Sequence, residues 1–290
     1  MDLCDIRAVK NLMATFSLRF RKEFGQNFLT NRRVVEAIAD ACSPEDPDVT
    51  VLEIGPGIGT LTRELADRYR AVRALEIDRS LLPVLSFTLS DRPNAKVFNE
   101  DVMKADLAAL LAPDFAAGPV FVCANLPYYI TTPILMKLLE SRLPFGAVTV
   151  MVQKEVADRL CAAPGTAAYG AITVALSYYG RCERLFVVPA GDFLPPPKVD
   201  SAVVRITLHR EKPFTPADEA LFFRTVKAAF SLRRKTLSNA LSNGFPELSK
   251  EVCTDLITAA GHRADIRGER LSGAEFSALS DLIAARLKKE

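Results

Sequence analysis

Three alternate glycines follow a run of apolar residues in the first quarter of the chain. The segment reads VLEIGPGIG, with Gly55, Gly57 and Gly59 in a turn between a predicted strand and a predicted helix. Glycine lets the backbone turn tightly and lets a ligand lie against it, because no Cβ stands in the way. The G-x-G-x-G spacing differs from the G-x-G-x-x-G of dinucleotide sites. Glu53 precedes the turn, and a carboxylate there disfavours a pyrophosphate and suits a cationic ligand.

Two further acids stand at the ends of the next predicted strands. Glu76, in LEID, is placed to accept both hydroxyls of a ribose. Asp101, in NEDV, is placed to accept a hydrogen bond from the amino group of an adenine. Together with the glycine turn, these acids predict a pocket for an adenosine with a positive tail that carries no phosphate. S-adenosylmethionine has this chemistry and is the predicted cofactor.

A polar and aromatic tetrapeptide follows the predicted strand 120–124. It reads Asn125-Leu126-Pro127-Tyr128. The amino group of a base is a poor nucleophile, because its lone pair is delocalised into the ring. The Asn125 amide oxygen and a main-chain carbonyl held outward by Pro127 can accept its two N–H bonds and favour a pyramidal nitrogen. Tyr128 offers a face on which the base can stack, so the pattern predicts methylation of a base amine without a strong general base.

A third element is the rigid segment that begins at Phe193. Three consecutive prolines, 195–197, hold the chain extended after it. We expect Phe193 to close on the opposite face of an extruded base. The structural alternative is a rigid surface loop with one buried aromatic ring.

The elements that must position these residues alternate between strand and helix from residue 49 to residue 161. Continuous apolar strands in repeated strand–helix units predict an α/β fold, a Rossmann-like, doubly wound and mostly parallel sheet. Segments 185–189 and 201–208 are predicted to close the sheet as antiparallel edge strands. Ligands of such sheets bind at the carboxyl ends of the strands.

The pattern becomes purely helical near residue 210. We therefore predict a catalytic cofactor-binding domain over 1–210, which includes a basic N-terminal segment, and a helical domain over 211–290. Segment 171–179 is ambiguous between strand and helix, and we favour helix.

Charge is distributed unevenly along the 290 residues, although the net charge is only +2. Residues 7–33 carry seven basic side chains and one acid, and residues 220–246 carry five basic side chains and no acid. A charge run is usually a solvated face, but two such blocks in an otherwise acidic chain predict a polyanion footprint. The basic residues of the second block are Arg224, Lys227, Arg233, Arg234 and Lys235.

Other classes of function are disfavoured. None of the six cysteines forms a C-x-x-C pair, and the two histidines lie in charged sequence, so we expect no metal site and reduced cysteines. Charged residues interrupt the N-terminal segment, and no apolar run reaches the length of a membrane span. We expect a cytoplasmic protein that does not enter a membrane.

Taken together, the motifs resemble the ribosomal RNA adenine-N6,N6-dimethyltransferase family, specifically its bacterial small-subunit branch. The segments that carry the resemblance are GQNFL (25–29), EIGPGIGTLT (53–62), LEID (75–78), NLPYYITTP (125–133), PPPKVDSAVVR (195–205) and AFSLRRKTLSNAL (229–241). The resemblance implies that Asn27 and Leu29 line the cofactor site with Gly55, Glu76, Asp101 and Asn125. It also implies that residues 125–128 form the catalytic loop and that Phe193 stacks on the target base. The helical domain, 211–290, is implied to be an RNA-binding domain.

The implied reaction is the dimethylation of two adjacent adenosines in the 3′-terminal hairpin loop of 16S rRNA, in an immature 30S subunit. Adenosines in a hairpin loop can be splayed out at low cost. Two alternatives are an adenine-N6 methyltransferase acting on 23S rRNA or DNA, and a non-catalytic ribosome assembly factor with the same fold. We expect a monomer, because no self-association motif stands out.

Overall fold

The computed structural model describes residues 1–18, 20–21 and 25–288. Arg19, Lys22 and Glu23 of the basic N-terminal segment lie outside the described residues. None of the described helices is long and apolar enough to span a bilayer.

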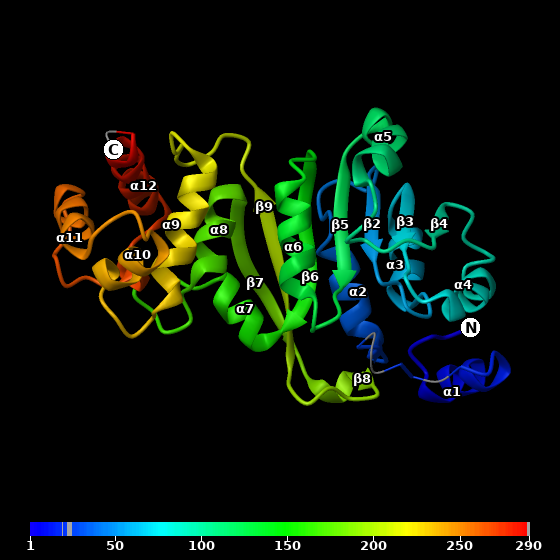
Figure 1. Ribbon diagram of the computed structural model, residues 1–290. Helices are drawn as coiled ribbons and strands as arrows, with labels where there is room; N and C mark the ends of the chain where they lie inside the picture. The colour runs from blue at the N-terminus through cyan, green and yellow to red at the C-terminus, as the bar shows by residue number, and fades with distance from the viewer. Residues whose placement is uncertain (19, 22–24, 289–290) are drawn as a thin grey trace. The chain divides into compact units, whose positions relative to one another are not determined.

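One seven-stranded sheet forms the centre of the first structural unit (Figure 1). The strand order is β4-β3-β2-β5-β6-β9-β7. Strands β2 to β6 pair in parallel, and β9 runs antiparallel to β6, which confirms the predicted α/β architecture. The strands are β2 (Thr50–Ile54), β3 (Ala71–Leu75), β4 (Ala95–Phe98), β5 (Val120–Asn125), β6 (Phe145–Gln153), β7 (Gly180–Val188) and β9 (Ser201–Leu208).

Helices between these strands bury the sheet. All five residues of β2 are buried, as a strand covered on both faces requires. On one face, Val35 and Ile38 of α2 and Leu65 of α3 pack into a cluster with residues of the central strands. Besides the N-terminal helix, the helices of this unit are α2 (Arg32–Asp40), α3 (Thr60–Arg68), α4 (Leu82–Thr88), α5 (Leu107–Ala117) and α6 (Thr131–Glu140). The first four residues of α7 (Lys154–Leu160) also belong to it.

The N-terminal segment forms a helix, α1 (Ile6–Thr15), capped by the side chain of Asp5. The helical spacing of Leu12, Phe16 and Phe20 extends past the helix, which ends at Thr15. All three side chains nevertheless belong to a cluster that packs against Val84 and Leu85 of α4. These three apolar side chains of the basic segment are therefore part of the core of the first unit.

A two-stranded sheet joins two motifs that are far apart in the sequence. β1 (Phe28–Leu29) pairs antiparallel with β8 (Phe193–Leu194). Thr30 N–H and Oγ1 both donate to the carbonyl of Asp192, 162 positions along the chain. Strands of two residues have no periodicity, so the sequence did not predict this pairing.

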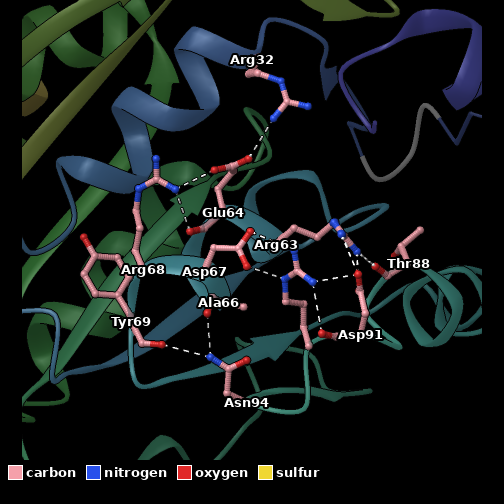
Figure 2. A network of polar contacts seen from close by, with 11 residues as sticks. Arg32, Arg63, Glu64, Ala66, Asp67, Arg68, Tyr69, Thr88, Asp91 and Asn94 are labelled. Carbon is pink, nitrogen blue, oxygen red and sulfur yellow. Dashed lines mark hydrogen bonds and ion pairs between the residues drawn. The ribbon is translucent and has the colours of Figure 1, made fainter. Parts of the chain in front are cut away.

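A polar network fixes α3 to its neighbours (Figure 2). Arg68 binds Glu64 one turn earlier in α3, as Figure 2 shows. Arg68 also pairs with Asp40 at the end of α2. Arg63 makes a two-pronged ion pair with Asp91 beyond α4. The glycine turn leads directly into α3, so this network also fixes the position of the turn.

The second unit is helical. Its helices are α8 (Ala171–Tyr179), α9 (Glu219–Ser231), α10 (Leu237–Gly244), α11 (Lys250–Ala259) and α12 (Gly273–Leu287). The predicted helix over 171–179 is confirmed. The boundary is more complex than a single cut near residue 210: contacts group residues 1–157 with 183–208, and residues 158–182 with 209–290. Val174 and Tyr178 of α8 pack in the same core as Phe222 of α9, which explains why the earlier segment joins the helical unit.

Candidate active site

A cavity opens at the carboxyl ends of the parallel strands. Residues at the ends of β2, β3, β4 and β5 line it, together with the segment Gly25–Leu29. The cavity and its mouth hold about 1050 Å³ of space free of protein atoms. Its walls include the predicted residues Asn27, Leu29, Gly55, Glu76, Asp101 and Asn125–Tyr128. The structure therefore brings all the residues predicted from the cofactor and catalytic motifs, except Phe193, to one place.

The glycine turn has the conformation that its sequence requires. Gly55, Gly57 and Gly59 have φ angles of +71°, +61° and +90°, which side chains with a Cβ rarely adopt. A Cβ on Gly55 would meet no atom within 4 Å, so the space beside it is open to a ligand. A Cβ on Gly57 would lie 3.1 Å from the ring of Phe28.

Glu76 connects the end of β3 to the glycine turn. Its Oε1 accepts a hydrogen bond from Asp78 N (2.8 Å) and its Oε2 accepts one from Gly57 N (3.2 Å). Burial raises the pKa of Glu76 to about 7, against the lowering effect of these N–H donors. Asp101 is held in a similar way, since its Oδ1 accepts from Met103 N (2.9 Å).

Glu53 is the most deeply buried acid of the cavity wall. Its side chain is 1% exposed, and its Oε2 has no hydrogen-bond partner among the described residues. Burial raises the pKa of Glu53 to about 8; the neighbouring Thr62 hydroxyl opposes this effect, and the nearby Glu76 adds to it. An unpaired carboxyl in a cavity wall is a binding group for a cation or a hydrogen-bond donor.

The Asn125 amide is oriented by the chain opposite. Its Nδ2 donates to the main-chain carbonyl of Asn27 at 3.2 Å. A carbonyl can only accept, so this contact assigns the NH₂ group and leaves Oδ1 as an acceptor. The Pro127 carbonyl accepts from Ile130 N and Thr131 Oγ1 at the start of α6. The structure describes no hydrogen bond to the carbonyl of buried Leu126, which leaves that carbonyl as a second acceptor.

Tyr128 is anchored by a residue that the sequence did not single out. Its hydroxyl lies 2.5 Å from Oγ of Ser201, the first residue of β9, which is fully buried. Burial raises the pKa of Tyr128, so the phenol is neutral at physiological pH. Only Ser201's place at the end of PPPKVDS could have suggested this contact.

A second unpredicted contact holds the Gly25–Leu29 segment at the cavity. Gln26 Nε2 donates to Asp78 Oδ2 at 2.9 Å, and Arg21 lies 3.5 Å from the same carboxylate. Asp78 is 2% exposed and also caps the short helix that follows β3 through Ser80. The fourth residue of LEID therefore fixes the wall segment to the strand that carries Glu76.

The structure does not bring Phe193 to the cavity. Its ring is 3% exposed and packs in the core cluster with Val35 and Ile38, on the strand that pairs with Leu29. The expectation that it covers the outer face of a base is therefore not met. The structure agrees instead with the alternative of a buried aromatic ring. The ring is buried because β8 pairs with β1 and directs Phe193 into the core.

The five basic residues of the helical unit divide into two groups. Arg224 donates to the carbonyl of Gly244 and pairs with Glu247, and Arg233 donates to the carbonyls of Ala167 and Tyr169. These two arginines have structural roles in their own unit. The structure describes no ion pair for the other three, which are exposed: Lys227, Arg234 and Lys235.

Known proteins share this combination of fold and motifs. Residues 17–265 match the family model described as "Ribosomal RNA adenine dimethylase". Two relatives are called "Ribosomal RNA small subunit methyltransferase A". The one from Alkaliphilus metalliredigens is 46% identical over 96% of each chain, and the one from Streptococcus pneumoniae strain ATCC 700669 is 45% identical over 98% of each chain.

Solved structures agree on the architecture. The 23S rRNA methyltransferase ErmE is similar over 89% of this chain and 100% of its own, with a TM-score of 0.67 and 29% identity. A dimethyladenosine transferase from Plasmodium falciparum is similar in fold over 90% of this chain and 98% of its own, with a TM-score of 0.73 and 24% identity. The cavity, the motifs around it and these similarities lead to one assignment: the chain belongs to the ribosomal RNA adenine dimethylase family.

Proposed function

We propose that this protein transfers methyl groups to N6 of two adjacent adenosines in the 3′-terminal hairpin loop of 16S rRNA, in an immature 30S subunit. Support comes from the small-subunit relatives, which match at about 45% identity over nearly the whole chain. The observation that carries the chemistry is the Asn125 amide, oriented by the Asn27 carbonyl in the wall of a cavity that Glu76 and Asp101 also line.

The cofactor is S-adenosylmethionine, which supplies an electrophilic methyl group on a sulfonium when bound. The cavity fits it by chemistry: open space at Gly55 for the ligand, Glu76 for ribose hydroxyls and Asp101 for the adenine amine. The orphaned Oε2 of Glu53 supplies a partner for the positive tail. The wall segment that contains Asn27 and Leu29 completes the enclosure.

In this proposal, Asn125 Oδ1 and Leu126 O accept the two N–H bonds of the target amine. Both acceptors draw the nitrogen lone pair out of conjugation with the ring, which lowers the barrier to methyl transfer. Tyr128 stacks on the adenine and is held by Ser201. After the transfer the nitrogen carries a positive charge, so its proton is acidic and passes to water.

We further propose that Lys227, Arg234 and Lys235 contact RNA phosphates. These three cations are exposed, and the structure describes no ion pair for them. Phosphate contacts carry no sequence information, so we expect RNA binding that weakens strongly with salt. We also propose that the protein acts in the cytoplasm, where its proposed ribosomal substrate is found, and as a monomer, because no self-association motif stands out in the sequence.

Mass spectrometry of the 3′-terminal rRNA hairpin tests the proposal. Unmodified 30S particles are incubated with enzyme and S-adenosylmethionine, and the fragment should gain methyl groups on two adjacent adenosines. Asn125→Ala should lower kcat by about 10²–10³-fold, the effect of losing one preorganised group at a reacting centre. Binding of the methyl donor and of RNA should change far less.

Two results would favour the alternatives. Methylation confined to 50S precursors would indicate that the substrate is 23S rRNA. The similarity to the 23S rRNA methyltransferase ErmE, at 29% identity, is the reason for testing this alternative. A non-catalytic assembly role would leave 30S maturation unaffected by Asn125→Ala in cells that carry only this variant.

A further inference from the structure

Tyr129 stands at the cavity with its ring exposed. It follows Tyr128 directly and belongs to the cavity wall. Its exposed fraction is 61%, the highest of any aromatic residue that the structure describes; Phe87, on α4, follows with 53%. An exposed aromatic ring at the wall of a cavity offers a free face on which a ligand can stack.

The ring borders the chain on one side and is otherwise exposed. A Cβ on Gly25 would lie 3.4 Å from Tyr129 Cδ1 and 3.6 Å from Cε1, so the ring borders the glycine backbone on one side. The hydrogen bond from Ile130 N to Pro127 O closes the turn that carries both tyrosines. Among the described residues, no hydrogen bond engages the Tyr129 hydroxyl. Tyr128, by contrast, is anchored by Ser201.

This arrangement provides two aromatic positions, one inside the cavity and one at its mouth. A base that turns into the cavity loses stacking with its neighbour, and the neighbour then exposes a π face of its own. An exposed aromatic ring can replace that stacking with any base, because stacking needs no hydrogen-bond readout.

We propose that Tyr129 is a stacking platform for the nucleobase next to the adenine in the cavity. This inference rests on the proposed function, since it concerns a substrate with two adjacent adenosines. The wall of the cavity would then select a single-stranded pair of bases over an isolated adenosine.

The chain contains no tryptophan, which gives a direct spectroscopic test. Tyr129→Trp keeps an aromatic platform and introduces the only indole. A saturating RNA hairpin with the adjacent adenosines should quench its emission through stacking. The hairpin is then prepared with an abasic site at one adenosine or at the other. Quenching should be lost with at least one of these two hairpins, which also identifies on which side the stacked base lies.

Equal quenching by the intact hairpin and by both abasic hairpins would overturn the inference, because the indole would then contact the target base or the backbone. Absence of quenching by the intact hairpin would overturn it as well.

Kinetic variants provide a second test. Tyr129→Leu keeps apolar bulk without a π face and should raise KM for RNA about tenfold, within the range for loss of one base–aromatic stack. Tyr129→Phe should behave like the wild type, and kcat should change little in either variant. Similar KM values for the leucine variant and the wild type would contradict the platform role. If the wild type itself methylates no adenosine pair, the proposed function fails instead, so the two failures are distinguishable.

Discussion

Replacing Glu53 with glutamine should change how the stability of the protein depends on pH. The carboxyl has a pKa of about 8 in the folded protein and an ordinary value of 4.5. Between these two pH values the folded chain holds a proton that the unfolded chain has released. The free energy of unfolding therefore falls as pH rises from 4.5 to 8, and the loss is complete above pH 8. Glutamine has the same shape and does not titrate.

The magnitude follows from the width of this pH window. Each pH unit within the window lowers the free energy of unfolding by about 1.4 kcal/mol. From pH 6 to pH 8 the wild type should therefore lose about 2–3 kcal/mol of unfolding free energy, which the Glu53→Gln variant should retain. The side chain is 1% exposed, so solvent screening does not reduce this value much. Urea unfolding at a series of pH values measures the difference. Glu140→Gln, which changes an exposed carboxyl on α6, is the matched control and should leave the pH profile unchanged.

Binding of the methyl donor gives an independent measurement of the protonation of Glu53. A cationic ligand beside Glu53 favours the ionised form, so binding should release protons near pH 7. Calorimetry in buffers with different heats of ionisation counts them. The Glu53→Gln variant should release fewer protons on binding. Those that it still releases should come from Glu76, whose pKa is about 7. Parallel stability profiles for wild type and Glu53→Gln, together with equal proton release, would refute the reasoning.

Three further predictions concern the rest of the site and the helical unit. Gly57→Ala should lower the free energy of unfolding by ~1–2 kcal/mol, because alanine at φ +61° is strained and its Cβ would lie 3.1 Å from the ring of Phe28. It should also weaken binding of the methyl donor, because Gly57 N donates to the Glu76 carboxylate in the cavity wall; urea unfolding and calorimetry measure the two effects separately. Tyr128→Phe and Ser201→Ala should each raise KM for RNA a few-fold and should not be additive in the double variant, since both remove one hydrogen bond worth about 0.5–1.5 kcal/mol; additive effects would show that the contact does not position the ring. Arg234→Ala should weaken RNA binding and lower its salt dependence by about one phosphate contact. Arg233→Ala should mainly destabilise the helical unit, because the Arg233 side chain binds two carbonyls there. Filter binding at several salt concentrations measures the first effect, and thermal unfolding measures the second.

Much of the cofactor site could be predicted from the sequence because its signals are local. The positive φ angles of Gly55 and Gly57 follow from residue type and from the strand-to-helix turn that contains them. Parallel strands meet at one edge, so Glu76 and Asp101 at consecutive strand ends had to lie near that turn. Asn125 reaches the same edge for the same reason.

Side-chain pairing across long separations was decided only by the tertiary structure. Tyr128 and Ser201 are 73 positions apart, and Asn125 and Asn27 are 98 apart, so no local pattern encodes their contacts. The position of Phe193 could not be predicted for the same reason, because an aromatic residue before prolines can either stack on a ligand or pack in the core. Pairing of β8 with β1 places it in the core.

The charge pattern along the chain established that the helical unit has a basic block, but not which of its cations face solvent. Arg224 and Arg233 bind carbonyls of their own unit, whereas Arg234 does not, although all three look alike in sequence. The sequence by itself thus determined the architecture and the chemistry at the strand ends, since these depend on residue type and periodicity. The partners of individual side chains depend on which distant segments pack together, and folding of the whole chain determines that.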